Sequence, residues 1–349
     1  MKNKNKHKNK SFLKKIFIKI CRKIGYEIVD QNNLFLPTLD AVATENLSKP
    51  GLSSITIPLG KIDITRKVKD ITIIIRSYTS TDISNSKIML DQNKKRVFDL
   101  QKIEYTLRTI NSLIISCHEA LCVFKNLKIR LIITDDNSPE NNCERIKSIL
   151  KKANFDTDFI KLDTNEYKDI INKNDEDGQP ISEGMISNMK NILKSINLTK
   201  QFANDLVYFV EDDYIHKKEA LTEMLFTYEK ISSQLNKEIF LCPADYPYLY
   251  SNVDDTKIFM GNHKHWRTVK ETLITFLTSK KMILKYLNYF ESMCTLRHHP
   301  MEKKLHEIYE KELCLSPIPS LAMHATNINS AYGIPPAYDW IKNWDENEI

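Results

Sequence analysis

The sequence predicts an α/β protein with a mixed, mainly parallel sheet flanked by helices. Short β-branched runs alternate with helix-like segments through the middle of the chain, which is the pattern of βαβ units. With 42% apolar and 28% charged residues, the composition is that of a globular protein. A chain of 349 residues can hold one large domain with extensions or two domains.

Residues 1–25 form a basic arm. They carry ten Lys and Arg residues and no acid, so removing them changes the formal charge from +6 to −4. The first ten residues are too polar to fold, whereas apolar residues recur at helical spacing from Phe12 to Ile24. Such a basic amphipathic helix suits an anionic membrane surface, and packing on the protein's own body is the alternative. The acidic remainder argues against a nucleic-acid partner.

The body is expected to begin at residue 69, after a connecting segment over residues 26–68 that contains three prolines. Ile71 to Ile75 is a continuous apolar run, as in a strand buried on both faces. Further strands are predicted at 129–134, 159–162, 206–210 and 239–242. Helices are predicted at 97–117, 143–153, 182–195 and 218–235. We divide the body into a first half, 69–215, and a second half, 216–349.

Several functional classes lack their motifs. The sequence contains no GxGxxG after the first strand, no GxxxxGK[ST] and no GxSxG, which argues against a dinucleotide fingerprint, a P-loop and an α/β-hydrolase elbow. The seven cysteines include no CxxC pair, so we expect free thiols in a reducing compartment rather than zinc ligands. No apolar run approaches the ~20 residues of a membrane span. A cytoplasmic protein is expected, with the arm able to place it at the inner face of the membrane.

Acidic residues follow two of the predicted strands. Asp135 and Asp136 come after the second strand, and Glu211-Asp212-Asp213 follow the fourth. Ligands bind beyond the carboxyl ends of strands in open parallel sheets, so these acids are expected to converge. Crowded carboxylates repel unless a cation offsets them, and a divalent ion held with substrate phosphates is the usual solution. Turn and helix-capping roles are the alternative for each acidic cluster.

These landmarks resemble those of GT-A glycosyltransferases of the family 2 type. The resemblance covers residues 69–213 most closely and rests on Ile73 to Thr79, Asp135-Asp136-Asn137-Ser138, Gly184 to Asn188 and Val210 to Asp213. It implies a GT-A fold with a Rossmann-like nucleotide-binding half and a DXD-like metal motif. The sequence departs from the family at Arg76, where a small residue or proline is common, and at Glu211, which replaces the first Asp of the metal motif.

The resemblance also implies roles for single residues. Ser77, Tyr78 and Asp135 are expected in the nucleoside pocket, and Gly184 and Asn188 on the ribose-phosphate side. Glu211 and Asp212 are expected beside the nucleotide. Asp213, with the late His324, is expected to hold Mn²⁺ or Mg²⁺.

The second half is expected to bind the acceptor. Tyr246 lies in an aromatic segment suited to stacking on a sugar, and His265-Trp266-Arg267 resembles the acceptor side of this fold, with Arg267 able to clamp a phosphate. An inverting enzyme needs a carboxylate base. Glu302 is the first choice, with Asp245 and Glu271 as rivals, although the helical pattern from Met301 to Leu313 favours a merely solvated Glu302. The segment from Tyr332 to Trp344 is expected to act as a lid or to pack as a strap.

We therefore expect a metal-dependent glycosyltransferase that moves a sugar from a nucleotide-sugar, such as a UDP-sugar, to a glycan or lipid-linked acceptor. A nucleotidyltransferase also combines acids, a metal and a nucleotide, but its Gly-rich first loop is missing here. A non-catalytic sugar-binding or scaffold protein on a degenerate version of the fold is the third possibility. Binding of UDP with and without Mn²⁺ separates the scaffold from the enzymes.

Overall fold

The computed structural model describes residues 12–26, 28, 50–51, 54–57, 60–80, 96–163, 165–167, 169–251, 253–326 and 328–349. The chain divides into two compact units, residues 1–47 with 56–61 and residues 48–55 with 62–349. The predicted unfolded start, residues 1–10, and most of the predicted connecting segment lie outside the described residues. Strands β1 (Ser54–Ile57) and β2 (Gly60–Asp63) form a two-stranded sheet.

The first unit contains the predicted amphipathic helix α1 (Phe12–Lys23). Its apolar side chains are exposed: Phe12 is 77%, Leu13 76% and Phe17 59% accessible. Its last turn is basic, with Arg22 and Lys23. Within the described residues, no helix combines the length and the apolar character that crossing a membrane requires.

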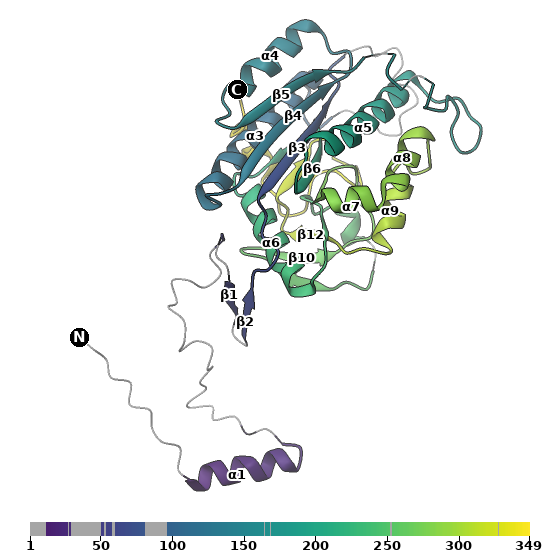
Figure 1. Cartoon of the computed structure of the whole chain (residues 1–349). Helices are drawn as coiled ribbons and strands as arrows, with labels where there is room; N and C mark the ends of the chain where they lie inside the picture. Colours follow the sequence, from purple (N-terminus) through teal and green to yellow (C-terminus); the bar gives the residue numbers. More distant parts are fainter. Residues whose placement is uncertain are drawn as a thin grey trace. The chain divides into compact units, whose positions relative to one another are not determined.

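A nine-stranded mixed sheet forms the centre of the second unit, in the order β5-β4-β3-β6-β11-β8-β12-β10-β9 (Figure 1). Its first four strands are parallel neighbours: β3 (Asp70–Ser77), β4 (Lys128–Asp135), β5 (Asp156–Lys161) and β6 (Leu206–Glu211). The α/β architecture predicted from the sequence, with a mixed sheet flanked by helices, is confirmed.

The other five strands extend the same sheet. Strand β11 runs antiparallel to β6 and β8, β12 is parallel to β8, and β10 is antiparallel to both β12 and β9. Their bounds are β8 (Phe240–Leu241), β9 (Ile258–Met260), β10 (His265–Thr268), β11 (Phe276–Ser279) and β12 (Cys314–Ile318). Because β11 lies between β6 and β8, strands from both halves of the body share one sheet.

Helices lie on both faces of the sheet, with α5 on one and α3 on the other (Figure 1). The longer ones are α3 (Lys102–Val123), α4 (Glu140–Leu150), α5 (Glu183–Phe202) and α6 (Ala220–Leu235). Shorter helices follow at α7 (Lys280–Lys285), α8 (Leu287–Thr295), α9 (Lys303–Tyr309) and α10 (Trp340–Asp345), and Pro247–Tyr250 form a 3₁₀ turn, η4.

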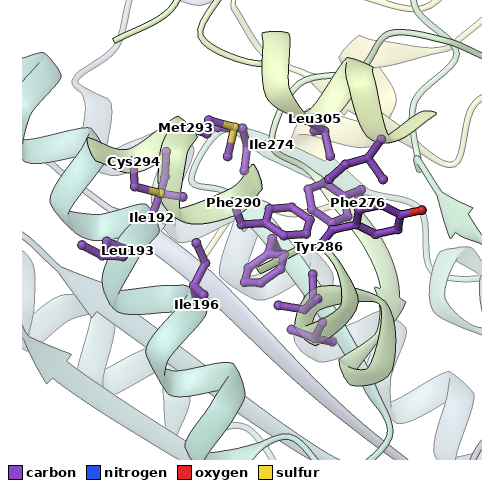
Figure 2. Close-up of a cluster of buried hydrophobic side chains, with 14 of the residues drawn as sticks. Ile192, Leu193, Ile196, Ile274, Phe276, Tyr286, Phe290, Met293, Cys294 and Leu305 are labelled. Carbon is purple, nitrogen blue, oxygen red and sulfur yellow. The ribbon is translucent and has the colours of Figure 1, made fainter. Parts of the chain in front are cut away.

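An apolar cluster joins α5 to the second half of the body (Figure 2). Ile192 and Ile196 on α5 face Phe290 and Met293 on α8, with Phe276 of β11 among them. Ile74 of β3 and Phe209 of β6 belong to the same cluster, so this face of the sheet is covered by α5 and α7–α9. Burial of such side chains contributes ~1.5–3 kcal/mol each. The cluster therefore holds the ends of β3 and β6 against α8 and α9.

Several element bounds differ from the predictions. The helix predicted from Val97 begins at Lys102, because Gln101 is still extended with ψ of 150°. The strand predicted at 71–75 continues to Ser77, since Arg76 pairs with Glu211 and Ser77 with Asp135. Apolar periodicity did not reveal these last two strand residues because they are polar.

A small second sheet lies at the end of the fold where the acids are found. Strands β7 (Tyr214–His216) and β13 (Ala322–His324) pair antiparallel, with Tyr214 opposite His324. Tyr338 and Trp344 pack into a cluster with Tyr105 of α3 and Met323 of β13. This part of the Tyr332 to Trp344 segment is therefore a packed strap.

Candidate functional site

The carboxyl ends of β3, β4 and β6 lie side by side. Ser77 is opposite Asp135 on β4, and Arg76 is opposite Glu211 on β6. Successive side chains of a strand point to opposite faces, so Ser77 and Arg76 leave β3 in opposite directions. The strand ends thus divide the polar residues into two groups, one on each face of the sheet.

Asp135 is a buried carboxylate with one open oxygen. It is 1% exposed, and its Oδ2 accepts a hydrogen bond of 3.2 Å from the backbone N–H of Ser138. Among the described residues, its Oδ1 has no hydrogen-bond partner, and neither has the buried hydroxyl of Ser77. A buried polar atom without a partner is destabilising, so this position favours a ligand with its own donors. The next residue, Tyr78, is 40% exposed and can present its ring to the same ligand.

Asp212 is fully engaged by the protein. Lys102 donates to its Oδ1 at 2.6 Å, and its Oδ2 accepts from the backbone N–H of Tyr78 and the hydroxyl of Thr106, both at 3.1 Å. These bonds tie the first turn of α3 to the ends of β3 and β6. Both oxygens of Asp212 already have partners, so this residue holds α3 and the end of β3 in position rather than contacting a nucleotide directly.

The two carboxylate oxygens of Asp213 have different surroundings. Its Oδ2 accepts from Lys102 at 3.0 Å and from Arg96 at 3.1 Å, whereas its Oδ1 lies 3.5 Å from Nε2 of His324. Burial raises the pKa of Asp213, but the positive charges of Lys102, His324 and Arg96 outweigh it and hold the pKa well below its ordinary value. The side chain is thus a permanent negative charge.

His324 is oriented as a metal ligand would be. Its Nδ1 lies 2.8 Å from the carbonyl oxygen of Tyr332 and donates to it, and the ring stacks on Tyr214 at 4.7 Å. This tautomer leaves a lone pair on Nε2, facing Asp213. Burial lowers the pKa of His324, yet the charge of Asp213 outweighs it and leaves the pKa raised, so a proton competes for this position in acid.

The Asp213–His324 pair fits Mn²⁺ or Mg²⁺. One carboxylate oxygen and one imidazole nitrogen 3.5 Å apart could both ligate one divalent ion. The carbonyl oxygen of Tyr332 accepts the hydrogen bond that fixes the orientation of the His324 ring. Asp213 and His324, predicted together from the sequence, are brought together by the pairing of β7 with β13.

Glu211 lies on the opposite face of the sheet, beside Arg76. Nη2 of Arg76 is 3.3 Å from its Oε1, and Thr275 donates to its Oε2 at 2.9 Å. The side chain of Arg76 is only 5% exposed, and within the described residues its Nε and Nη1 have no hydrogen-bond partner. Arg76 also lines a small cavity with apolar residues of α5, β11 and α8, such as Ile192, Phe276 and Phe290. The guanidinium of Arg76 is thus a second buried group, after Asp135 and Ser77, with polar atoms that lack hydrogen-bond partners among the described residues.

Glu302 has the properties of a general base. It is partly buried at the start of α9, and burial together with the negative charge of Glu211 raises its pKa to about 7. Arg297 and Arg76 oppose this shift only in part. A carboxylate that titrates near neutral pH can accept a proton efficiently in a reaction at that pH. Glu302 is half-buried rather than fully solvated.

The start of α5 approaches Glu302 from the other side. Nδ2 of Asn188 lies 3.5 Å from the sulfur of Met301, the residue before Glu302. Gly184, in the first turn of α5, has nothing within 4 Å of the position that a side chain would occupy. The first turn of α5 therefore leaves open space, as the ribose-phosphate role expected for Gly184 requires.

Glu271 stands in an aromatic surface group rather than at a buried centre. It is exposed, its backbone carbonyl accepts from the hydroxyl of Tyr248 at 2.6 Å, and its Oε2 accepts from Tyr332 at 3.1 Å. The rings of Tyr248 and Tyr332 lie 5.0 Å apart. An accessible carboxylate next to two tyrosines suits binding of sugar hydroxyls better than proton transfer.

The proposed catalytic role of Asp245 and the phosphate role of Arg267 do not fit the structure. Asp245 is fully buried and forms an ion pair with Arg267, while Tyr250 donates to its other oxygen. The guanidinium of Arg267 also stacks over the ring of Tyr250. Each charge has a buried partner, so neither is free to meet a substrate.

Tyr246 and Trp266, which were predicted to contact the acceptor, are also buried away from any substrate. Both are 0% exposed. The hydroxyl of Tyr246 lies 2.6 Å from that of Tyr214, and Nε1 of Trp266 donates to Glu223 on α6 at 3.2 Å. Their aromatic character reflects core packing, whereas Tyr248 and Tyr332 are half-buried.

Sequence reasoning missed Arg96, Lys102, Thr106 and Thr275. None of them follows a predicted strand, which was the signal used to select candidates. Lys102 and Thr106 are separated by four residues on α3 and so share one helix face, a spacing visible in the sequence. Arg96 belongs to no helix or strand, so no pattern singled it out.

No family model matches the sequence, and a search of curated proteins finds no match either. Solved structures align over part of the chain. The crystal structure of S. aureus TarS 1–349 gives a TM-score of 0.38 at 11% identity, over 71% of this chain and 57% of that one, and the longer TarS structure gives 0.34 at 13%, over 62% and 29%. UDP-glucose pyrophosphorylase complexed with UDP-glucose gives 0.36 at 10%, over 80% and 97%. The chain thus spans only part of the TarS structures that it resembles, and the likeness is one of α/β fold.

Proposed function

We propose that the protein is a metal-dependent, inverting glycosyltransferase that moves a sugar from a UDP-sugar to a glycan or lipid-linked acceptor. The observation that carries the proposal is the presence of two oppositely tuned groups of residues near the carboxyl end of β6. Asp213 and His324 form an oriented ligand pair, and Glu302 has a pKa raised to about 7. Nucleotide-sugar transfer needs both functions, charge compensation for a diphosphate and a base for an acceptor hydroxyl.

Donor binding is assigned to the first half of the body. The open Oδ1 of Asp135 would accept from an N–H of the base. The hydroxyl of Ser77, the residue opposite Asp135 on β3, is also buried and has no hydrogen-bond partner among the described residues. Tyr78 would cover the nucleoside with its exposed ring. The space at Gly184 and the amide of Asn188 would then meet the ribose-phosphate part of the donor.

Transfer itself would use Glu302. Its carboxylate takes the proton of the acceptor hydroxyl while that oxygen forms the new bond to the anomeric carbon and the bond from that carbon to the diphosphate oxygen breaks. Asp213 and His324 would hold Mn²⁺ or Mg²⁺, which supplies Lewis-acid stabilisation of the leaving diphosphate. Arg76 keeps Glu211 paired, which limits the negative charge that Glu302 experiences.

The test is a product assay with several UDP-sugars, with and without Mn²⁺. We expect metal-dependent release of UDP, first by slow hydrolysis and faster with a suitable glycan or lipid-linked acceptor. Release of pyrophosphate from UTP and a sugar phosphate would identify the alternative, a nucleotidyltransferase. Absence of UDP binding by calorimetry, with and without Mn²⁺, would identify a non-catalytic protein and overturn the proposal.

We also propose that α1 rests on an anionic membrane, where lipid-linked acceptors are found. The exposed Phe12, Leu13 and Phe17 would insert between lipids, and Arg22 and Lys23 would meet the head groups. The unaltered protein should sediment with phosphatidylglycerol vesicles, and the double variant Phe12→Ser/Phe17→Ser should remain in the supernatant. The exposed Val253→Ser is the matched control in the second unit. Equal sedimentation of both variants would exclude α1 as the anchor.

A further inference from the structure

Two basic side chains occupy the acidic cluster that follows β6. Lys102 bridges the two acids, with Nζ 2.6 Å from Asp212 and 3.0 Å from Asp213, and Arg96 reaches Asp213 at 3.1 Å. The acid side chains are 10% exposed, against 20% for Lys102 and 33% for Arg96. Two negative and two positive charges therefore nearly cancel within the cluster.

The position of Lys102 is not explained by helix stability. It is the first residue of α3, where the positive end of the helix dipole disfavours a cation. The acids of the cluster offset this cost. Asp212 also accepts from Thr106 one turn further along α3, so the helix is attached to the strand ends without needing Lys102. The contact between Lys102 and Asp213 is therefore not required to hold α3 in place, and it can serve ligand binding instead.

The charge balance decides how strongly an ion can bind here. An ion at Oδ1 of Asp213 and Nε2 of His324 would meet a carboxylate whose charge Lys102 and Arg96 already offset. Both cations would also repel it at short range in a partly buried site, where such interactions are several times stronger than in water. A diphosphate removes the conflict, because it brings negative charge for the ion and acceptor oxygens for Lys102 and Arg96.

We propose that Lys102 and Arg96 couple ion binding to diphosphate binding. Without nucleotide they keep Asp213 occupied and the ion weakly bound. With a nucleoside diphosphate they donate to its phosphate oxygens as well, and Asp213 becomes a strong ligand. This inference rests on the proposed function, since it assigns Lys102 and Arg96 to the diphosphate of the same donor.

Binding measurements on the full chain test the coupling. Mn²⁺ is titrated by electron paramagnetic resonance without nucleotide and with saturating UDP, after correction for the Mn²⁺–UDP complex in solution. For the unaltered protein we expect Mn²⁺ to bind at least tenfold more tightly when UDP is present. By thermodynamic linkage, Mn²⁺ should tighten the binding of UDP by the same factor. Lys102→Met should strengthen binding of Mn²⁺ alone by about tenfold while weakening binding of UDP alone.

A matched control is available on α5. Lys194 also has a side chain that is 20% exposed and an ion pair, to Glu166 at 2.8 Å, so Lys194→Met should leave both affinities unchanged. Arg96→Gln, which lies outside any helix, should act in the same direction as Lys102→Met and remains usable if that variant unfolds. Lys102→Arg should retain the coupling.

Two failures are distinguishable. If Mn²⁺ binds the unaltered protein but Lys102→Met and Arg96→Gln leave its affinity unchanged, the coupling is overturned and the proposed function stands. If Mn²⁺ binds none of the proteins, even with UDP, the ion site itself fails, and the proposed function fails with it.

Discussion

Asp213, which follows β6, and Glu302, at the start of α9, are two acids in opposite electrostatic surroundings. Around Asp213, the cations Lys102 and Arg96 hold the pKa well below its usual range. Around Glu302, burial and the nearby Glu211 raise the pKa to about 7. The first acid stays charged at any physiological pH, and the second can change its charge. Under the proposed function, this difference would assign charge compensation to Asp213 and proton transfer to Glu302.

The largest effect is expected from removing the titratable acid. Glu302→Gln keeps the size of the side chain but cannot accept a proton, so transfer should fall by about 10²- to 10⁴-fold with UDP binding retained. Steady-state kinetics and calorimetry separate the two quantities. Glu307→Gln on the same helix, where Glu307 pairs with Lys304, is the control and should retain activity. Equal turnover of the Glu302 variant would return this residue to a structural role.

Removing the permanent charge should be the next largest effect. Asp213→Asn should lower Mn²⁺ affinity and reduce turnover by at least about 100-fold, which corresponds to ~2.7 kcal/mol of transition-state stabilisation. Asp212→Asn is the contrasting variant, because its loss should appear mainly in thermal stability through the bonds to Lys102, Thr106 and Tyr78. Full, still metal-dependent transfer by Asp213→Asn would place the ion elsewhere.

A smaller effect is expected in the nucleoside pocket. Asp135→Ala removes an acceptor for a charge-assisted hydrogen bond worth ~1.5–3 kcal/mol, so the Kd for UDP should rise about 10- to 150-fold. Calorimetry measures it directly. An unchanged Kd would mean that Asp135 serves only to hold Ser138 in the turn after β4.

The smallest and most specific test is the pH profile. A base with a pKa of about 7 is protonated below that value, so turnover should rise up to tenfold per pH unit below 7 and level off above it. This ascending limb should disappear in Glu302→Gln. The substitution also removes the need to ionise a buried group, so at pH 8 the variant should unfold at an equal or higher temperature. A profile of Glu302→Gln with the same limb near pH 7 would assign it to another group.

The order of strands and helices was predictable because apolar runs alternate regularly through the first half of the body. The strand ends were predictable for the same reason, since Asp135 and Glu211 directly follow such runs. The second half was harder. There, Tyr246 and Trp266 have the composition of a sugar-binding segment, yet they are fully buried. Periodicity cannot distinguish an aromatic residue in a core from one in a cleft when the strands are only two to five residues long.

The charges around Asp213 were not predictable from local pattern. Lys102 and Arg96 meet Asp213 across more than 100 positions of sequence, and only the packing of α3 on the strand ends brings them there. Glu302 was selected by resemblance, but its raised pKa comes from burial first and then from the nearby charge of Glu211. Long-range contacts of this kind follow from the assembled sheet.

The packing of the α10 strap affects the order in which parts of the site can fold. Trp344 stacks on Phe98 at 3.8 Å, and Phe98 is two residues from Arg96. Arg108 of α3 lies over the same indole ring at 4.2 Å. The contact of α10 with Phe98 thus supports the segment that brings Arg96 to Asp213, so a nascent chain arrested before α10 has every acid of the site but lacks the support for one of its cations. We therefore expect the segment around Arg96 to reach its final position only after α10 has been synthesised.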